Sequence, residues 1–259
     1  MRVLSLPFLL CTALAASAVI AAPAASALLY ERALMLEANK RCRLFTPAVS
    51  GALTTAALQA RSAARRAGDA PTALDAVERR AASKARATPC TSPDLAVAAG
   101  RVRSAHEGLS RVARMEFPGG TAGWSADRTR SRNPRWRVVQ KTRIGDEALS
   151  FGLASENAAP PRLFAVSSFE RAPTLVRLSA GGRTFLAEDL RRAPEPLRNG
   201  DDALAFRFSP AAAEALEKLD PRETVRLEFV TLTRTGERSR SAEIEVGDFA
   251  AARAFVAAG

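Results

Sequence analysis

The stretch TLVRLSAGGRTFLAE, from Thr174 to Glu188, carries the clearest fold signal in the chain. Two short runs of apolar and β-branched residues lie on either side of Gly181-Gly182. A Gly-Gly pair between two such runs predicts a two-residue β-hairpin turn, because this turn needs positive φ angles that glycine adopts easily. The stretch therefore predicts a pair of antiparallel strands.

Further runs of the same kind, bounded by Pro, Gly and Asn, predict strands on both sides of this hairpin. They are WRVVQKTRI from Trp136, EALSFGLA from Glu147, RLFAVSSF from Arg162, ALAFRFS from Ala203, TVRLEFVTL from Thr224 and SAEIEVG from Ser241. Ser209 and Asp248 each mark a helix start, for PAAAEALEKL and FAAARAFVAA. We expect residues 136–259 to form an antiparallel β-sandwich-like domain with a C-terminal helix.

Residues 28–117 show a different pattern, in which apolar side chains recur every three or four positions. This period predicts helices with one apolar stripe each. Thr46 before Pro47 and Ser92 before Pro93 are typical helix starts. We expect about four helices joined by short turns in an antiparallel bundle, and an α+β fold for the whole chain.

Residues 1–27 have the layout of a secretory signal peptide. Arg2 precedes a long apolar run, and Ala25-Ser26-Ala27 matches a cleavage site, although cleavage at another small residue is open. An uncleaved anchor is the alternative, because residues 3–22 are about long enough to span a bilayer. We expect an exported protein, periplasmic or secreted, with no transmembrane anchor after cleavage.

Cys42 and Cys90 are the cysteines that remain after cleavage. An exported protein with one cysteine pair is expected to form a disulfide, here from the end of the first helix to the turn before the fourth. Two buried free thiols are the alternative. With a single histidine and no C-x-x-C motif, the chain gives no reason to expect a metal or another cofactor.

Positive charge is concentrated in one part of the chain, which carries +11 in total. Residues 28–117 carry +7 and residues 118–143 carry +6, whereas residues 144–259 carry −3. The stretch DRTRSRNPRWR, from Asp127 to Arg137 and called the arginine segment below, lies at the end of a predicted basic linker, residues 118–135. Its candidate anion-binding residues are Arg128, Arg130, Arg132, Arg135, Trp136 and Arg137.

Arginine forks bind carboxylate and phosphate groups in pairs, and Trp124 or Trp136 could stack on a base or a sugar. For an exported protein this favours an envelope protein or an anionic envelope glycan or lipid as partner, and no physiological nucleic acid. For the segment itself the sequence favours a charged joint between two domains, with Trp136 starting the first strand and packed in its core, over a binding site. A third interpretation is that the arginines face acidic residues across the domain contact.

Catalytic groups are harder to find. His106 is predicted at the flank of the fourth helix, and FPGGTAG, residues 117–123, lacks the Lys-Ser/Thr of a phosphate loop. Paired carboxylates leave a glycosidase-like hydrolase open, since such an enzyme needs only two, but Glu188-Asp189 and Asp201-Asp202 are typical of solvated turns. We assign no catalytic residue.

The last fifty residues combine a strand, a helix, two strands and then Gly247, Phe249, Ala250, Ala251 and Phe255. This arrangement resembles the C-terminal end of the invasion-associated locus B family of exported bacterial β-sandwich proteins. The resemblance spans about residues 136–256 and implies a periplasmic or envelope-associated, non-enzymatic protein. This chain departs from the family in having no cysteine in its β half.

Together these observations predict a non-enzymatic interaction protein of the cell envelope that binds a protein or an anionic glycan or lipid. An exported hydrolase with paired carboxylates and a purely structural two-domain envelope protein are the alternatives.

Overall fold

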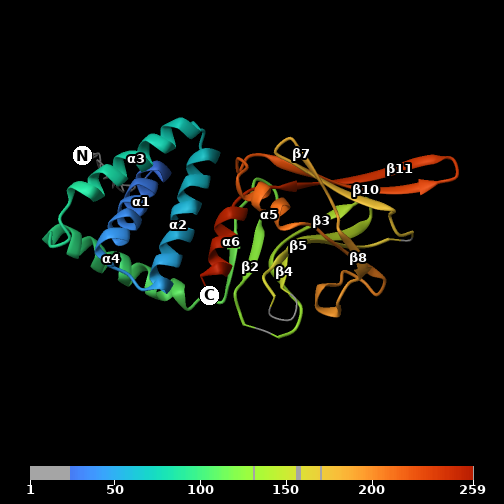
Figure 1. Ribbon diagram of the computed structural model, residues 1–259, viewed down its shortest axis with the longest axis horizontal. Coiled ribbons are helices and arrows are strands. Elements are labelled where there is room, and N and C mark those ends of the chain that lie inside the picture. The colour runs from blue at the N-terminus through green and yellow to red at the C-terminus, as the bar shows by residue number, and fades with distance from the viewer. Residues whose placement is uncertain (1–23, 131, 156–158, 170, 259) are drawn as a thin grey trace, which may run out of the picture.

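The computed structural model describes residues 24–130, 132–155, 159–169 and 171–258. The predicted signal peptide lies outside these residues except for its last four, of which Ala25-Ser26-Ala27 form the first turn of a helix. Within the described residues the chain forms a four-helix region followed by a β domain with antiparallel sheets of seven and four strands (Figure 1). The predicted α+β fold is confirmed.

The helical region consists of α1 (Ala25–Cys42), α2 (Pro47–Arg66), α3 (Pro71–Ala87) and α4 (Pro93–Ser110). Thr46 caps α2 as predicted, because its side chain accepts a hydrogen bond from Val49 N at 3.4 Å. The buried side chains between the helices are largely alanine, with Leu29, Met35, Leu53, Leu74 and Leu95 as the larger ones. Small side chains let the helices approach closely but bury little apolar area each.

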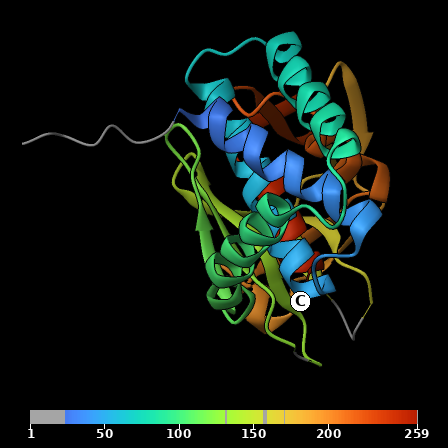
Figure 2. The same cartoon turned by 90° about the vertical axis from the view of Figure 1, so that its left-hand side faces the viewer.

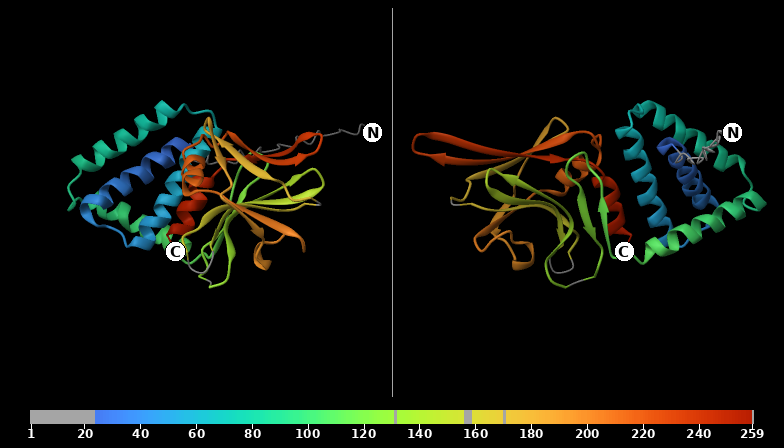
Figure 3. Two further views of the ribbon diagram at one scale, coloured as in Figure 1. Left: turned by 45° about the vertical axis from the view of Figure 1, so that its right-hand side comes forward. Right: turned by 180° about the vertical axis from the view of Figure 1, so that it is seen from behind.

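The β domain contains the strands β1 (Arg114–Phe117), β2 (Trp124–Asp127), β3 (Arg135–Ile144), β4 (Glu147–Ser155), β5 (Arg162–Ser168), β6 (Leu175–Ala180), β7 (Arg183–Leu186), β8 (Asp189–Arg192), β9 (Ala203–Arg207), β10 (Thr224–Thr233) and β11 (Gly236–Glu245). The larger sheet has the order β1-β2-β3-β4-β5-β9-β8, and the smaller one has the order β11-β10-β6-β7. Figure 3 shows the β10–β11 hairpin extending beyond the rest of the domain.

The glycine hairpin forms as predicted. Ala180 pairs with Arg183, and Gly181 and Gly182 have φ angles of 56° and 71°, in the left-handed region that glycine adopts more easily than other residues. Side chains from both sheets then share one core, which includes Phe151 and Leu153 of the larger sheet and Leu178 and Phe229 of the smaller.

Two helices and a short helical turn complete the domain: α5 (Pro210–Glu217), α6 (Phe249–Ala257) and η1 (Glu195–Leu197). Phe249 and Phe255 of α6 belong to the core between the sheets, while the opposite side of α6 packs against α2. Figure 2, in which the helical region faces the viewer, shows α6 behind α1 and α2. The C-terminal helix therefore joins the two halves.

The structure corrects the expected boundary between the halves. The helices end at Ser110 rather than near residue 117, and the predicted linker 118–135 contains β2, so the first strand is β1 and not the one that includes Trp136. β8 was not predicted either. These strands have four residues each, which is too short for a periodic pattern to stand out.

Candidate functional site

The arginines of the arginine segment do not form one surface, because Arg128 is buried. Arg128 is only 8% exposed and donates hydrogen bonds to Val112 O at 2.7 Å and Leu109 O at 2.6 Å. Its guanidinium lies 4.3 Å from the centre of the Phe255 ring. Arg128 thus satisfies carbonyl groups at the end of α4 and stacks on α6, which makes it a joint between the two halves.

Arg135 and Arg137 are held by neighbours in the same segment. Arg135 Nη2 lies 2.5 Å from Asp127 Oδ2, which also accepts a hydrogen bond from Arg114 Nε at 2.8 Å. Arg137 donates to Thr129 O at 2.5 Å. Burial would raise the pKa of Asp127, but the hydrogen bonds from Thr129 and Arg114 and the charge of Arg135 outweigh it and hold this pKa below its ordinary value. Arg130 and Arg132 are exposed.

Arg135 and Trp136 line an open groove of about 540 Å³ on the outer face of the larger sheet. Its other charged lining residues are Arg114, Glu116, Asp127 and Lys141. Trp136 is partly buried and packs against a small cluster that includes Ala154, Phe164 and Leu197. The groove thus combines three cations, two carboxylates and one anchored indole ring.

A β-bulge positions Trp136. The register of β3 against β4 shifts between Trp136 and Val138, and such a shift bends a strand and redirects its side chains. The partner strand allows this because it has a glycine at the contact. A Cβ atom on Gly152 would lie 2.0 Å from the carbonyl oxygen of Val138. The sequence therefore needs glycine here for β3 to carry Trp136 in this position.

Trp124 corrects the expectation that both tryptophans could stack on a ligand. It is fully buried, donates from Nε1 to Val246 O at 2.9 Å and packs against Phe151 and Phe249. Trp124 is a core residue, which the sequence pattern around a four-residue strand does not reveal.

Arginines of α2, outside the predicted segment, face acidic residues across the contact between the two halves. Arg65 Nε lies 2.9 Å from Asp220 Oδ2, and Arg66 Nη1 lies 2.5 Å from Asp248 Oδ1. Hydrogen bonds from Arg222 and Arg65 hold the pKa of Asp220 far below its ordinary value despite its partial burial. This is the arrangement that the structural interpretation of the arginines requires.

Asp248 also corrects a prediction. It occupies the N-cap position of α6, but its side chain makes no cap hydrogen bond and pairs with Arg66 instead. Ser92 and Ser209 stand at the predicted N-cap positions, and their side chains make no cap hydrogen bond either.

The loop Gly120–Ala122 binds a carboxylate of the protein itself. The backbone N–H groups of Gly120, Thr121 and Ala122 donate to Glu245 at 2.6, 2.8 and 3.1 Å, and the Thr121 hydroxyl adds a fourth hydrogen bond. Consecutive N–H groups that converge in this way form an anion-binding nest. The loop Gly120–Ala122 is therefore neither a phosphate loop nor a free linker, because its hydrogen bonds to Glu245 connect β11 to the residues just before β2.

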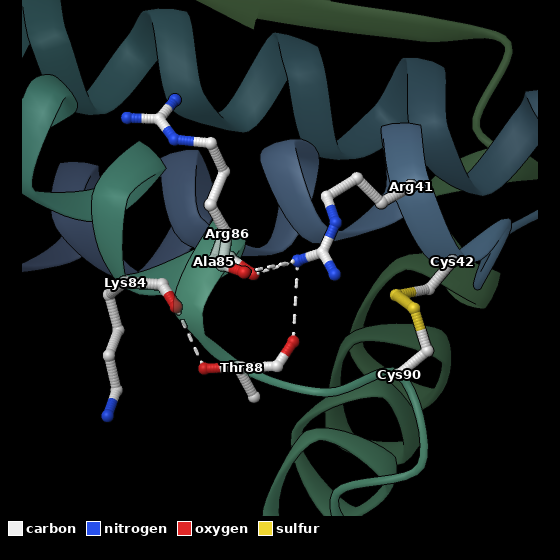
Figure 4. The surroundings of a disulfide bond; sticks show 7 residues. All are labelled: Arg41, Cys42, Lys84, Ala85, Arg86, Thr88 and Cys90. Atoms are coloured by element: carbon white, nitrogen blue, oxygen red, sulfur yellow. Dashed lines mark hydrogen bonds between the residues drawn. A yellow bond between two sulfur atoms is a disulfide. The ribbon is translucent and has the colours of Figure 1, made fainter.

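Cys42 and Cys90 form the predicted disulfide, with Cα atoms 5.5 Å apart. It joins the last residue of α1 to the turn between α3 and α4 (Figure 4). Beside it, Arg41 donates to the carbonyl groups of Ala85, Arg86 and Thr88 at 2.5, 3.0 and 3.4 Å. The end of α1 thus satisfies carbonyls that the end of α3 leaves free.

His106 is half-buried on α4, and burial, followed by the charge of Arg32, lowers its pKa.

The candidate carboxylates do not form a catalytic pair with each other. Glu188 pairs with Arg162 and Asp189 with Arg207, while Asp201 and Asp202 are exposed. Among the described residues, no group of three histidine, cysteine, aspartate or glutamate side chains is placed to hold a metal ion.

Comparison of the chain with protein-family models, curated proteins and solved structures found no match in any of the three. The resemblance to the invasion-associated locus B family therefore stays a prediction from the sequence. Within residues 24–258, apart from the positions that the structure does not describe, no helix is long and apolar enough to cross a bilayer.

Proposed function

We propose that this protein is an exported, non-enzymatic interaction protein of the cell envelope and that it binds an anionic glycan in the groove beside Trp136. One observation carries the proposal. Of the predicted anion-binding residues, Arg135 and Trp136 line the same groove, and Arg114 and Lys141 add two further cations to it.

The chemistry of this groove suits a sugar acid. A partly exposed indole ring offers an apolar face for a sugar ring, and guanidinium forks bind carboxylate groups. Asp127 pairs with both Arg114 and Arg135, and the partly buried Arg135 is held by this contact, which reduces the side-chain entropy that it would lose on binding. Glu116 and Asp127 also line the groove, so its three cations leave it a net charge of only +1 and contact with the indole ring must add to the charge attraction.

The test is capture of the full mature protein by immobilised polygalacturonate, an acidic glycan, beside neutral dextran and anionic lipid vesicles. A double variant, Arg135→Gln with Trp136→Ala, removes two of the proposed contacts and leaves Arg114, Lys141 and the structural Arg128 in place. The matched control is Arg130→Gln with Arg132→Gln, which removes two exposed arginines of the same segment. Ionic strength is raised from about 0.01 M to about 1 M, so that the Debye screening length falls from ~30 Å to ~3 Å and charge attraction is lost.

We expect the wild type and the control to bind polygalacturonate at low salt and to be released at high salt, and the double variant to bind at least about tenfold more weakly. Equal capture of all three proteins would reject the groove. Capture by vesicles alone would replace the glycan with a lipid partner.

The interface ion pairs favour a second, structural role for other arginines. Arg65 and Arg66 are occupied by Asp220 and Asp248, so their charges serve the contact between the two halves rather than a ligand. Two of the positive charges of the helical region, those of Arg65 and Arg66, therefore stabilise the fold.

A further inference from the structure

Three arginines that lie far apart in the chain meet in a crevice of about 400 Å³. Arg162 is the first residue of β5, Arg207 is the last residue of β9, and Arg253 belongs to α6. The remaining lining residues are prolines and alanines, Ala154, Ala159, Pro160, Pro161 and Pro210. Among the described residues, no carboxylate lines this crevice, in contrast to the groove beside Trp136.

Strand pairing explains how two of these arginines come together. Phe164 of β5 pairs directly with Arg207 of β9, and Arg162 precedes Phe164 by two positions, which places its side chain on the same face of the sheet. Pro210, at the first position of α5, also lines the crevice, so the N-terminal end of that helix lies beside it.

Each arginine uses part of its guanidinium to bind its own chain. Arg162 Nη2 lies 3.0 Å from Glu188, Arg207 Nη2 lies 3.5 Å from Asp189, and Arg253 Nη1 lies 2.7 Å from Glu217. These carboxylates hold the arginines in place from outside the crevice. A guanidinium has five N–H donors, so each arginine keeps several for another partner.

Two of the remaining donors are buried. The Nε atoms of Arg162 and Arg207 have almost no solvent contact and no hydrogen-bond partner among the described residues. A buried donor without a partner is costly, and three guanidinium groups around one crevice also repel one another. A bound anion would relieve the repulsion between the guanidinium groups through their exposed Nη atoms, whereas the two Nε atoms lie too deep for it to contact.

We propose that this crevice binds a small oxyanionic group, a carboxylate or a phosphoryl or sulfuryl group, through Arg162, Arg207 and Arg253. Planar guanidinium forks match the paired oxygens of these groups. The prolines in the wall fix their own φ angles, which lowers the backbone entropy that ordering this wall on binding would cost. This site is separate from the groove in the proposed function and does not depend on it.

The two sites lie on the same face of the larger sheet. Ala154 is the cross-strand partner of both Trp136 and Arg162, which puts those two residues two strand spacings apart, roughly 10 Å. A polymer could reach both sites, so the test must use small anions that cannot span them.

The experiment titrates the full mature protein with inorganic phosphate, sulfate and glucuronate, with affinity measured by calorimetry at low ionic strength. The first variant is Arg253→Gln, which lies on a partly exposed helix face and leaves the strand pairing intact. The second is Arg162→Lys, which keeps the charge and removes the fork. The matched control is Arg226→Gln, an exposed arginine of β10 that also has one acidic partner, Glu243.

We expect the wild type, the Arg226→Gln control and an Arg135→Gln variant of the groove to bind at least one of the three anions equally well. Arg253→Gln should bind it about tenfold more weakly or worse, because each charge-assisted hydrogen bond lost accounts for about that factor. Arg162→Lys should also weaken binding, which separates fork geometry from net charge.

The anion that binds most tightly identifies the class of ligand. Preference for glucuronate would indicate a sugar acid, and preference for phosphate or sulfate would indicate a phosphoryl or sulfuryl group. No binding of any of the three anions to the wild type would overturn the proposal. So would equal losses in Arg253→Gln and Arg226→Gln. A loss confined to Arg135→Gln would place the small anion in the groove beside Trp136 instead.

Discussion

Arg66 of α2 and Asp248 at the start of α6 form an ion pair with Nη1 and Oδ1 2.5 Å apart, and the Asp248 side chain is 1% exposed. Among the ion pairs of the described residues, this one includes a nearly fully buried carboxylate. It links the helical region to the helix that covers the β core. The loss of stability when this ion pair is removed therefore measures how much it contributes to holding the two halves together.

Replacing Arg66 with methionine should destabilise the protein by about 3 kcal/mol at neutral pH, because it leaves a buried carboxylate without its counter-charge. Urea denaturation followed by circular dichroism measures this loss. Arg61→Met is the control, since Arg61 lies on the same helix and pairs with the half-exposed Asp75 and Glu78. The control should cost less than about 1 kcal/mol.

The pH dependence of the Arg66→Met loss is a second prediction. Burial raises the pKa of Asp248, and the opposing hydrogen bond and charge of Arg66 do not fully offset it. A raised folded-state pKa gives a contribution that is full below the unfolded value of about 3.9 and falls as pH rises through the folded value.

Without Arg66 this pKa rises further. The loss in Arg66→Met should therefore shrink as pH falls from 7 towards 4, because the protonated carboxyl needs no counter-charge. Denaturation curves for the variant and the wild type at both pH values decide the matter. An equal loss at pH 7 and pH 4 would mean that Asp248 does not carry the effect.

Arg128 and Arg132 should respond very differently to alanine substitution, although they lie four positions apart. Arg128→Ala should cost about 2 kcal/mol, since it removes the side-chain donor to Val112 O, leaves Leu109 O with backbone N–H donors alone, and removes the contact with Phe255. The exposed Arg132 should change stability by less than about 0.5 kcal/mol. Similar values for the two variants in urea denaturation would contradict this division of the segment.

This contrast shows where prediction from the sequence ends. The four helices, the glycine hairpin and the disulfide follow from local signals, namely a 3.6-residue period, a Gly-Gly turn and a single cysteine pair. Which arginine of DRTRSRNPRWR is buried depends on the end of α4 and on Phe255, which no local signal connects to Arg128. Composition predicts that the segment is rich in arginine side chains, but only tertiary packing determines which of them are buried and which are exposed.

The candidate sites follow the same rule. The sequence marks Arg135 and Trp136 as neighbours, and the structure brings both to one groove. Arg162, Arg207 and Arg253 are isolated residues in three different elements, and only strand register and the position of α6 bring them together. Arg65 and Arg66 read as the basic last turn of a helix, a common pattern that does not reveal their acidic partners.

Replacing both Cys42 and Cys90 with serine should lower stability by about 2–4 kcal/mol, because the bond closes a loop of 48 residues in the unfolded chain. The small alanine-rich core of the helical region gives little compensation. Thermal unfolding with and without a reducing agent measures the effect. The reduced wild type should unfold at the temperature of the double variant, and a reduced wild type as stable as the oxidised one would show that the bond adds nothing.

Glu245 gives the last prediction, one with the opposite pH dependence. Burial would raise its pKa, but the hydrogen bonds from Thr121 and from the backbone of Gly120 and Ala122 outweigh it, so the pKa lies below its ordinary value. A lowered folded-state pKa gives stability that is present above the unfolded value of about 4.3 and is lost as pH falls through the folded value.

Glu245→Gln should therefore cost about 1 kcal/mol at pH 7, a figure kept small because the site is only partly buried. The amide has one oxygen to accept from donors that converge on two, and its N–H groups point at other N–H groups. The cost should vanish at low pH, where the wild-type carboxyl is also protonated. Glu243→Gln, at an exposed pair with Arg226, is the control and should show neither the cost nor the pH dependence. If the two variants behave alike, the nest at Gly120–Ala122 does not fasten β11, and the fold must rely there on Gln140, whose amide bonds both backbone groups of Glu245.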